Sequence, residues 1–191
     1  MDSRFEINLP MLYHALEFYA SRGYKMITVP MCVDWEAIEV TMPSDRFAKH
    51  HGKDKFYVGS AEQSFIQLIQ EYEKNGRPMS QHGSFMALTP CQRNEEVVDD
   101  SHFEIFLKLE LISFDRNPQF DAWDFFHKYR PSGDKMEIVQ EKDTEVDIQL
   151  NGIEIGSYGQ RTINGLTINY GTGLAMPRIS YALSKGVHSL A

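Results

Sequence analysis

The chain has 191 residues, of which 42% are hydrophobic and 12% aromatic, enough for one domain whose core needs no disulfide or metal staple. Its formal net charge of −8 argues against a nucleic-acid partner held by phosphate neutralisation alone, because such modules are usually basic. Cys32 and Cys91 lack metal-binding spacing, and we interpret them as buried thiols in a reducing compartment. The N-terminal residues contain early acids and no long apolar run, so we expect neither a signal peptide nor a membrane span, and a cytoplasmic location.

The first elements are predicted to be a helix followed by a strand. Apolar residues recur at helical spacing from Leu9 to Tyr19, and the pattern stops at a helix-ending Arg-Gly pair. YKMITVP then predicts a strand that ends at Pro30. The polar residues 43–55 predict a loop, in which we interpret the pair His50-His51 as solvated rather than metal-binding.

Predicted strands dominate the middle of the chain. A short strand at 56–60 precedes a helix over 61–73. Two long strands, at 84–95 and 102–114, are joined by the acidic linker 96–101. In the second, apolar residues alternate with Lys and Glu, the period of a strand that buries one face.

The last third of the chain predicts a helix, four strands and a final helix. Their ranges are 120–130, 135–139, 144–150, 153–157, 166–170 and about 174–184. Asn151-Gly152, between two of these strands, is a strong hairpin-turn signal. No repeat or low-complexity segment interrupts the chain, so we predict a single α+β domain over 1–191, with helices around an antiparallel sheet.

Polar side chains gather on the two long predicted strands. Arg93 and Glu95 lie two positions apart, and taken alone they would be interpreted as a surface ion pair. His102, Phe106 and Glu110 are spaced four apart, so alternation puts them on one face of the returning strand. A guanidinium for a phosphate, a ring for a base and carboxylates for magnesium would suit a nucleoside triphosphate. The sequence has no G-x-x-x-x-G-K-[ST], which excludes a P-loop.

Two further stretches combine glycines with charged residues. Asp147 and Glu154 flank the Asn-Gly turn, and Arg161 follows a glycine-rich stretch that we interpret as a loop. GTGLAMPR ends in Arg178, within the first turns of the last predicted helix. Small residues before a helix usually serve close packing, but an arginine there would be able to reach the sheet.

Together these stretches resemble the catalytic core of class II aminoacyl-tRNA synthetases, most closely the aspartyl/asparaginyl branch. Residues 18–30, 92–110 and 170–178 look like the three class motifs in family order, and 58–63 looks like the loop that receives the substrate's amino group. The aspartyl branch carries D-x-x-x-N-G-x-E-x-G followed by an arginine. This sequence is similar to it at Asp147, Asn151, Gly152, Glu154, Gly156 and Arg161.

The resemblance implies a six-stranded antiparallel sheet flanked by helices, usually in a homodimer formed through the N-terminal helix and the strand ending at Pro30. It also implies that ATP and Mg2+ activate an amino acid as an aminoacyl-adenylate, releasing pyrophosphate. On the ATP side, Arg93 would hold the α-phosphate beside Glu95. Phe106 and Arg178 would sandwich the adenine, with His102 near the γ-phosphate.

On the amino-acid side, the resemblance implies that Ser60 and Glu62 receive the α-amino group. Arg161 would grip the side chain of aspartate or asparagine, a bidentate role that suits arginine. Glu154, with Asp147, would bind magnesium.

Three departures distinguish this chain from the aspartyl branch. Phe65 stands where that branch has a lysine that helps to select aspartate, and Pro177 stands where an acid is common. Gly171 follows Arg161 by only ten positions (171 − 161 = 10). No anticodon-binding domain is expected within the 191 residues, which favours a pared-down relative over a complete tRNA synthetase.

Several functions are compatible with these observations. The leading hypothesis is a ligase that adenylates an aspartate-like amino acid and passes it to ammonia, as in asparagine synthetase, or to a small molecule, a protein or tRNA. A tRNA partner is possible but gains no support from the charge. The alternatives are a non-catalytic paralogue that acts as a ligand sensor or regulatory subunit, and a bare tRNA-binding module.

Overall fold

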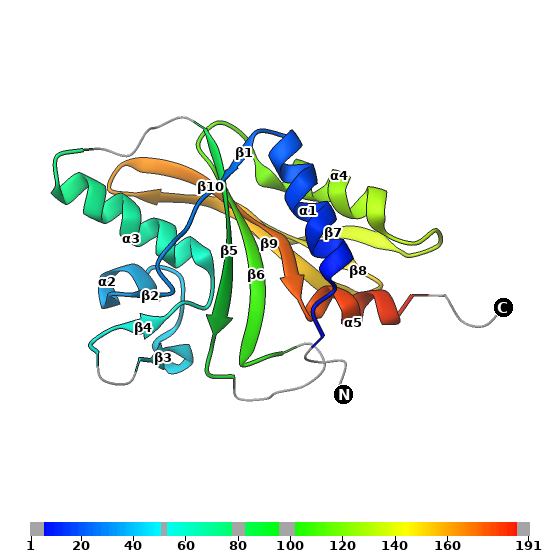
Figure 1. Cartoon of the computed structure of the whole chain (residues 1–191), viewed down its shortest axis with the longest axis horizontal. Coiled ribbons are helices and arrows are strands. Elements are labelled where there is room, and N and C mark those ends of the chain that lie inside the picture. The colour runs from blue at the N-terminus through cyan, green and yellow to red at the C-terminus, as the bar shows by residue number, and fades with distance from the viewer. Residues whose placement is uncertain (1–5, 51–52, 78–82, 96–101, 187–191) are drawn as a thin grey trace.

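The structure, a computed structural model, describes residues 6–50, 53–77, 83–95 and 102–186 (Figure 1). In chain order its elements are α1 (Leu9–Ser21), β1 (Tyr24–Met26), β2 (Cys32–Val33), α2 (Trp35–Ile38), the 3-10 turn η2 (Ser44–Arg46), β3 (Ala48–Lys49), β4 (Phe56–Tyr57), α3 (Ala61–Lys74), β5 (Ser84–Gln92), β6 (Ile105–Ser113), α4 (Pro118–Tyr129), β7 (Met136–Lys142), β8 (Glu145–Leu150), β9 (Ile153–Ile163), β10 (Leu166–Met176) and α5 (Arg178–Ser184). No helix in this described part of the chain has the length and apolar content that crossing a bilayer requires.

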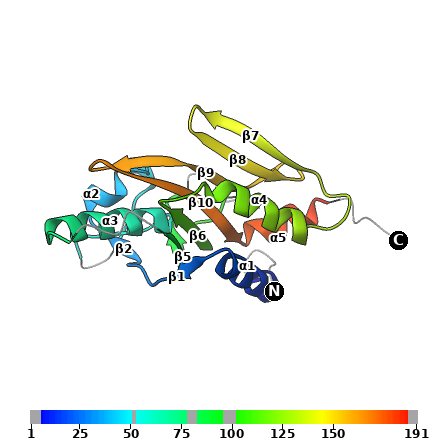
Figure 2. The ribbon, with the colours of Figure 1, turned by 90° about the horizontal axis from the view of Figure 1, so that it is seen from above.

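The main sheet has seven strands in the order β1-β5-β6-β10-β9-β8-β7. All neighbours are antiparallel except β1 and β5, which pair in parallel. The α+β class is confirmed, but the expectation of six strands is wrong, because both edge strands, β1 and β7, hydrogen-bond to the sheet. Figure 2 shows the β7–β8 hairpin projecting from one edge of the molecule. A separate three-stranded sheet is ordered β2-β4-β3.

The two faces of the main sheet bury separate cores. Leu109 and Leu111 of β6 pack into a core shared with α1 and α4, whereas Ile112 packs into a core shared with α3. Figure 1 shows α2, α3 and the small sheet toward one end of the main sheet and α1, α4 and α5 toward the other. Because side chains alternate along a strand, Lys108 and Glu110 point to the same face as Ile112, the face that α3 covers.

The hairpin turn at Asn151-Gly152 is confirmed. Both residues have positive φ, 53° and 78°, as a type I′ turn requires. Asn164-Gly165 forms a second turn of this kind, with φ of 50° and 82°, and it joins β9 directly to β10.

Several predicted boundaries are wrong. The stretch before Arg161 is not a loop, since β9 continues to Ile163, and β10 continues to Met176, so that the last helix begins only at Arg178. The first strand ends at Met26 rather than Pro30. β5 and β6 are shorter than predicted, so Arg93, Glu95 and His102 lie just beyond their ends. The acidic linker 96–101 and His51 fall outside the described residues.

Candidate functional site

A pocket of about 320 Å³ lies on the α3 side of the main sheet. Its walls come from the segment 41–46, the N-terminus of α3, the ends of β5 and β6, and strands β9 and β10. It brings together nine of the ten residues singled out from the sequence: Ser60, Glu62, Arg93, Glu95, His102, Phe106, Glu154, Arg161 and Arg178. Residues distant in sequence therefore converge on one cavity.

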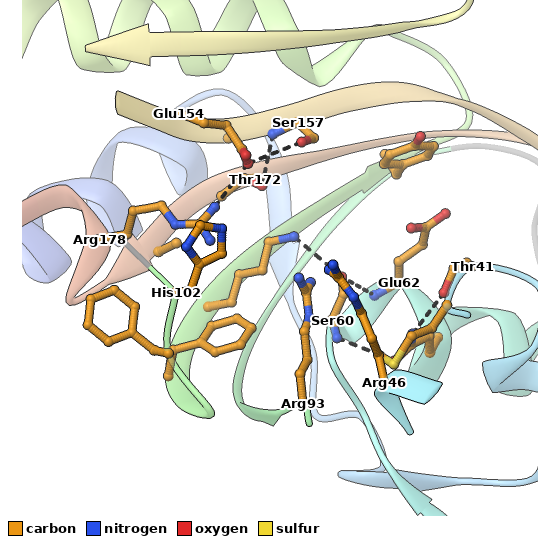
Figure 3. A pocket seen from close by; sticks show the side chains of 18 of the residues that line it. Thr41, Arg46, Ser60, Glu62, Arg93, His102, Glu154, Ser157, Thr172 and Arg178 are labelled. Carbon is orange, nitrogen blue, oxygen red and sulfur yellow. Dashed lines mark hydrogen bonds and ion pairs between the residues drawn. The ribbon is translucent and has the colours of Figure 1, made fainter. Parts of the chain in front are cut away.

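Figure 3 shows how the labelled side chains divide the pocket. Arg178, His102 and Glu154 lie toward one end, Glu62 and Thr41 lie toward the other, and Arg93 stands between them. The cavity thus has two ends of different composition joined at an arginine.

The N-terminus of α3 is fastened to the sheet by Ser60. The Ser60 side chain accepts a hydrogen bond from the Glu62 backbone N–H at 3.2 Å and donates one to the carboxylate of Glu110, which is buried. Lys108 Nζ lies 2.9 Å from the same carboxylate and 3.4 Å from Ser60 Oγ. This cap satisfies a helix donor and fixes the position of Glu62 at the pocket wall.

Arg161 forms an ion pair with Glu62 at the amino-acid end. The Arg161 Nε–Glu62 Oε1 distance is 2.6 Å, and Arg161 Nη1 lies 3.4 Å from the Val40 carbonyl oxygen. The guanidinium also stacks over the Tyr170 ring, 5.2 Å from its centroid. Burial raises the pKa of Glu62, while the neighbouring Arg161 opposes that shift; Glu62 in turn raises the pKa of Arg161 against the effect of burial.

Arg93 is held by the backbone of the loop before α3. Its Nε and Nη2 donate to the Gly59 carbonyl oxygen at 3.0 and 2.7 Å. The guanidinium lies 5.2 Å from the centroid of Phe106. Burial lowers the pKa of Arg93, but an arginine stays charged at any physiological pH.

At the other end of the pocket, Arg178 begins α5 and reaches a carboxylate on β9. Arg178 Nη1 donates to Glu154 Oε1 at 3.0 Å, and Ser157 Oγ donates to the same oxygen at 3.3 Å. The sequence predicted this arginine within the first turns of a helix beginning at about residue 174, but Arg178 is the first residue of α5.

Asp147 is the predicted site residue that does not line the pocket. It lies on β8, paired in register with Ser157, and it is buried. Burial raises the pKa of Asp147 to about 6, against a hydrogen bond with Ser157. Within the ranges the structure describes, no three His, Cys, Asp or Glu residues are grouped so as to hold a metal ion. Of the two predicted metal ligands, Glu154 lines the cavity and Asp147 does not.

The pocket also contains residues that the sequence did not single out, among them Lys108, Arg46 and Tyr170. Lys108 carried a local signal, because it lies midway between Phe106 and Glu110 on the face they share. Arg46 carried none, because the fold alone brings its segment to the site. Tyr170 begins the segment 170–178 that resembles a class motif, but no role was predicted for it from the sequence.

No model of a known protein family matches the chain. A serine–tRNA ligase from Picrophilus torridus is 25% identical to it over 134 residues, covering 64% of this chain and 29% of that protein. The chain thus spans less than a third of the length of this curated relative.

Solved structures share the fold. The chain superposes on a pyrrolysyl tRNA synthetase, PylSc of Desulfitobacterium hafniense, with a TM-score of 0.69 and 15% identity, covering 94% of this chain and 68% of that one. A seryl-tRNA synthetase of Pyrococcus horikoshii complexed with ATP superposes with a TM-score of 0.68 and 13% identity, covering 95% of this chain and 51% of that one. A cytoplasmic serine-tRNA ligase of Naegleria fowleri in complex with AMP superposes with a TM-score of 0.66 and 14% identity, covering 95% of this chain and 49% of that one.

The fold is therefore that of class II synthetase cores: α+β with a mostly antiparallel sheet. The aspartyl/asparaginyl branch implied by the motif around Asp147 and Arg161 is not among these relatives, which are seryl and pyrrolysyl synthetases.

Proposed function

We propose that this pocket activates an amino acid with ATP. The amino acid's carboxylate oxygen would form a bond to the α-phosphorus while the bond from phosphorus to the bridging oxygen of the β-phosphate breaks, and the electron pair leaves on pyrophosphate. The observation that carries the proposal is the convergence of arginines from three separate segments, Arg93, Arg161 and Arg178, on one cavity of a synthetase-like fold. Such a reaction needs positioning and charge stabilisation more than covalent help from the protein.

In this proposal the ATP lies between Arg93 and Arg178. Arg93 would exchange its two hydrogen bonds with the Gly59 carbonyl for oxygens of the α-phosphate and the attacking carboxylate. Phe106, already within 5.2 Å of Arg93, would stack on the adenine, with Arg178 on its other face. His102 and Glu95 would complete the nucleotide side.

The amino acid would lie at the Glu62 end. Its α-ammonium group would bind Glu62 beside Ser60, and its side chain would bind Arg161. An aspartate-like substrate suits this pair, because its ammonium and carboxylate replace the partners that Arg161 and Glu62 now give each other at 2.6 Å. The departure at Phe65 does not touch this geometry, since Phe65 is fully buried in the core. In an asparagine synthetase-like reaction the side-chain carboxylate would instead attack the α-phosphorus, and ammonia would then displace AMP to leave a carboxamide in its place.

The residues around Glu154 fit a magnesium ion bound together with nucleotide phosphates. Mg2+ usually takes one or two carboxylates and completes its coordination with phosphate oxygens and water. Glu154 would supply a carboxylate after releasing Arg178, and Asp147 is proposed as the second ligand only if β8 shifts toward the cavity. The ion would neutralise phosphate charge.

We also propose a homodimer formed through α1 and β1. Both elements leave apolar side chains exposed: Leu9 is 66%, Tyr13 58% and Met26 50% exposed. Apolar side chains gathered on neighbouring elements are typical of surfaces that bind a second chain. The acceptor of the activated amino acid, whether ammonia, a small molecule, a protein or tRNA, is left to experiment.

ATP–pyrophosphate exchange with each proteinogenic amino acid and magnesium tests the proposal. We expect exchange with an amino acid whose side chain bears a carboxylate or carboxamide, and we expect the exchange rate to fall about a hundredfold or more in Arg93→Ala. Arg77→Ala, an exposed arginine outside the pocket, should match the wild type. No exchange with any amino acid, from protein shown to be folded, would leave a non-catalytic ligand-binding paralogue.

A further inference from the structure

Arg46 is a pocket-lining arginine that the proposed roles leave unused. It ends η2, and its side chain is 51% exposed. The nearest acid is Glu95, whose Oε2 lies 3.9 Å from Arg46 Nη1, too far for a hydrogen bond. Within the described ranges the Arg46 guanidinium donates no hydrogen bond, whereas the other three arginines of the pocket each donate to a protein oxygen. As far as the described residues are concerned, its donors are therefore available to a ligand.

The backbone around Arg46 is fixed to the same strand end that carries Arg93. The Asn94 N–H donates to the Arg46 carbonyl oxygen at 3.2 Å, and Asn94 Nδ2 donates to the Phe47 carbonyl oxygen at 2.6 Å. Asn94 directly follows Arg93, so the two arginines keep a set relation. Figure 3 shows both of them directed into the pocket.

The two guanidinium groups share one carboxylate. Glu95 is the ion-pair partner of Arg46 and also acts electrostatically on Arg93. Two cations directed at one region attract an anion that carries more than a single charge, since one carboxylate neutralises only one of them. At the centre of this pocket the anion that gains charge during activation is the α-phosphoryl group.

We propose that Arg46 is a second α-phosphate-binding residue, which approaches the phosphoryl group from the 41–46 segment while Arg93 approaches from the sheet. The inference rests on the proposed function, because it uses the position of the α-phosphate at Arg93. It adds a residue from outside the three motif-like segments, so that this segment forms part of the reaction centre.

Calorimetric binding of ATP, AMP and adenosine tests the assignment. We expect Arg46→Gln to weaken the binding of ATP and of AMP by the same factor, about tenfold, and to leave the binding of adenosine unchanged. The α-phosphate is the one group that ATP and AMP share and adenosine lacks. Arg46→Lys should restore part of the loss, since it keeps the charge but not the planar fork. Lys49→Gln is the matched control: it removes one positive charge from the neighbouring strand β3, at a side chain that is 64% exposed and outside the pocket.

Three outcomes would overturn the assignment. Weaker ATP binding with unchanged AMP binding would move the contact to the β- and γ-phosphates. Unchanged binding of both nucleotides by Arg46→Gln would make Arg46 a solvated surface residue and leave the proposed function standing. Failure of the wild type to bind any of the three compounds would remove the proposed function itself, and this inference with it.

Discussion

At the residue scale, three of the four arginines of the site already donate hydrogen bonds to protein oxygens before a ligand arrives. Arg93 donates to the Gly59 carbonyl, Arg161 to Glu62 and Arg178 to Glu154. A hydrogen bond to a charged group contributes about 1.5–3 kcal/mol, so a ligand must offer each arginine a better acceptor than the one it leaves. Phosphates and carboxylates do so through bidentate contacts, which neutral ligands do not provide.

Asp147 gives a prediction about pH. Burial raises its pKa from 3.8 to about 6, so between these values the folded protein holds a proton that the unfolded chain has lost. The contribution of Asp147 to the free energy of unfolding therefore falls as pH rises through this window, and Asp147→Asn removes that contribution.

Relative to the wild type, the unfolding free energy of Asp147→Asn should increase from about pH 4 to about pH 6 and should stay constant above about pH 6. Urea unfolding of both proteins at several pH values measures it. All other titrating groups are common to the two proteins, so a difference that does not vary with pH would show that Asp147 has an ordinary pKa.

At the element scale, Gly59 marks the point where three segments meet. A side chain there would place its Cβ 2.8 Å from Arg93 Nε and against the methyl group of Met42, so the loop before α3, the 41–46 segment and the end of β5 approach closely only because residue 59 is glycine. Arg93 also needs the Gly59 carbonyl oxygen as its acceptor.

Gly59→Ala should therefore displace Arg93. We expect destabilisation of about 1–3 kcal/mol from overpacking, together with a loss of pyrophosphate exchange that persists at temperatures where the variant is fully folded. Thermal unfolding and exchange assays on the same preparation separate the two effects. Full exchange activity in a folded variant would mean that Arg93 does not need its present position.

The sequence identified those elements whose signals are local. The strand at β6 and the Asn151-Gly152 turn depend on near neighbours, and both were predicted correctly. The expectation that β6 buries only one face is wrong, because Glu110 and Ile112 are buried as well as Leu109 and Leu111. The extension of β9 was missed because its glycines lower strand propensity. In the fold Gly159 lies under the Tyr170 ring, where a Cβ would meet Tyr170 Oη at 2.7 Å. That contact is set by the β9–β10 pairing and leaves no trace in the local sequence.

The candidate site shows the same limit. Nine of the pocket residues were predicted because they stand at fixed spacing in segments that resemble family motifs. Arg46 was not predicted, because its segment was interpreted only as a loop. The parallel pairing of β1 with β5 joins residues about sixty positions apart, Tyr24 with Ser84, and no periodicity reports such a contact.

At the scale of the whole molecule, the seven-stranded sheet holds residues from both halves of the chain in fixed register around one cavity. The same fold occurs in seryl and pyrrolysyl synthetases, but this chain covers only 68%, 51% and 49% of the three structures compared. The fold thus provides the cavity, and the side chains around Arg93, Glu62 and Arg161 must account for any substrate choice.

The most direct test of adenylate formation is calorimetric binding of non-hydrolysable sulfamoyl analogues of aspartyl-, asparaginyl- and seryl-adenylate. A pocket built for an aminoacyl-adenylate should bind one of these at least about a hundredfold more tightly than ATP or the free amino acid, because the analogue fills both ends at once. Arg161→Gln should remove the preference among the three side chains. Binding of all three analogues no tighter than adenosine would contradict the account.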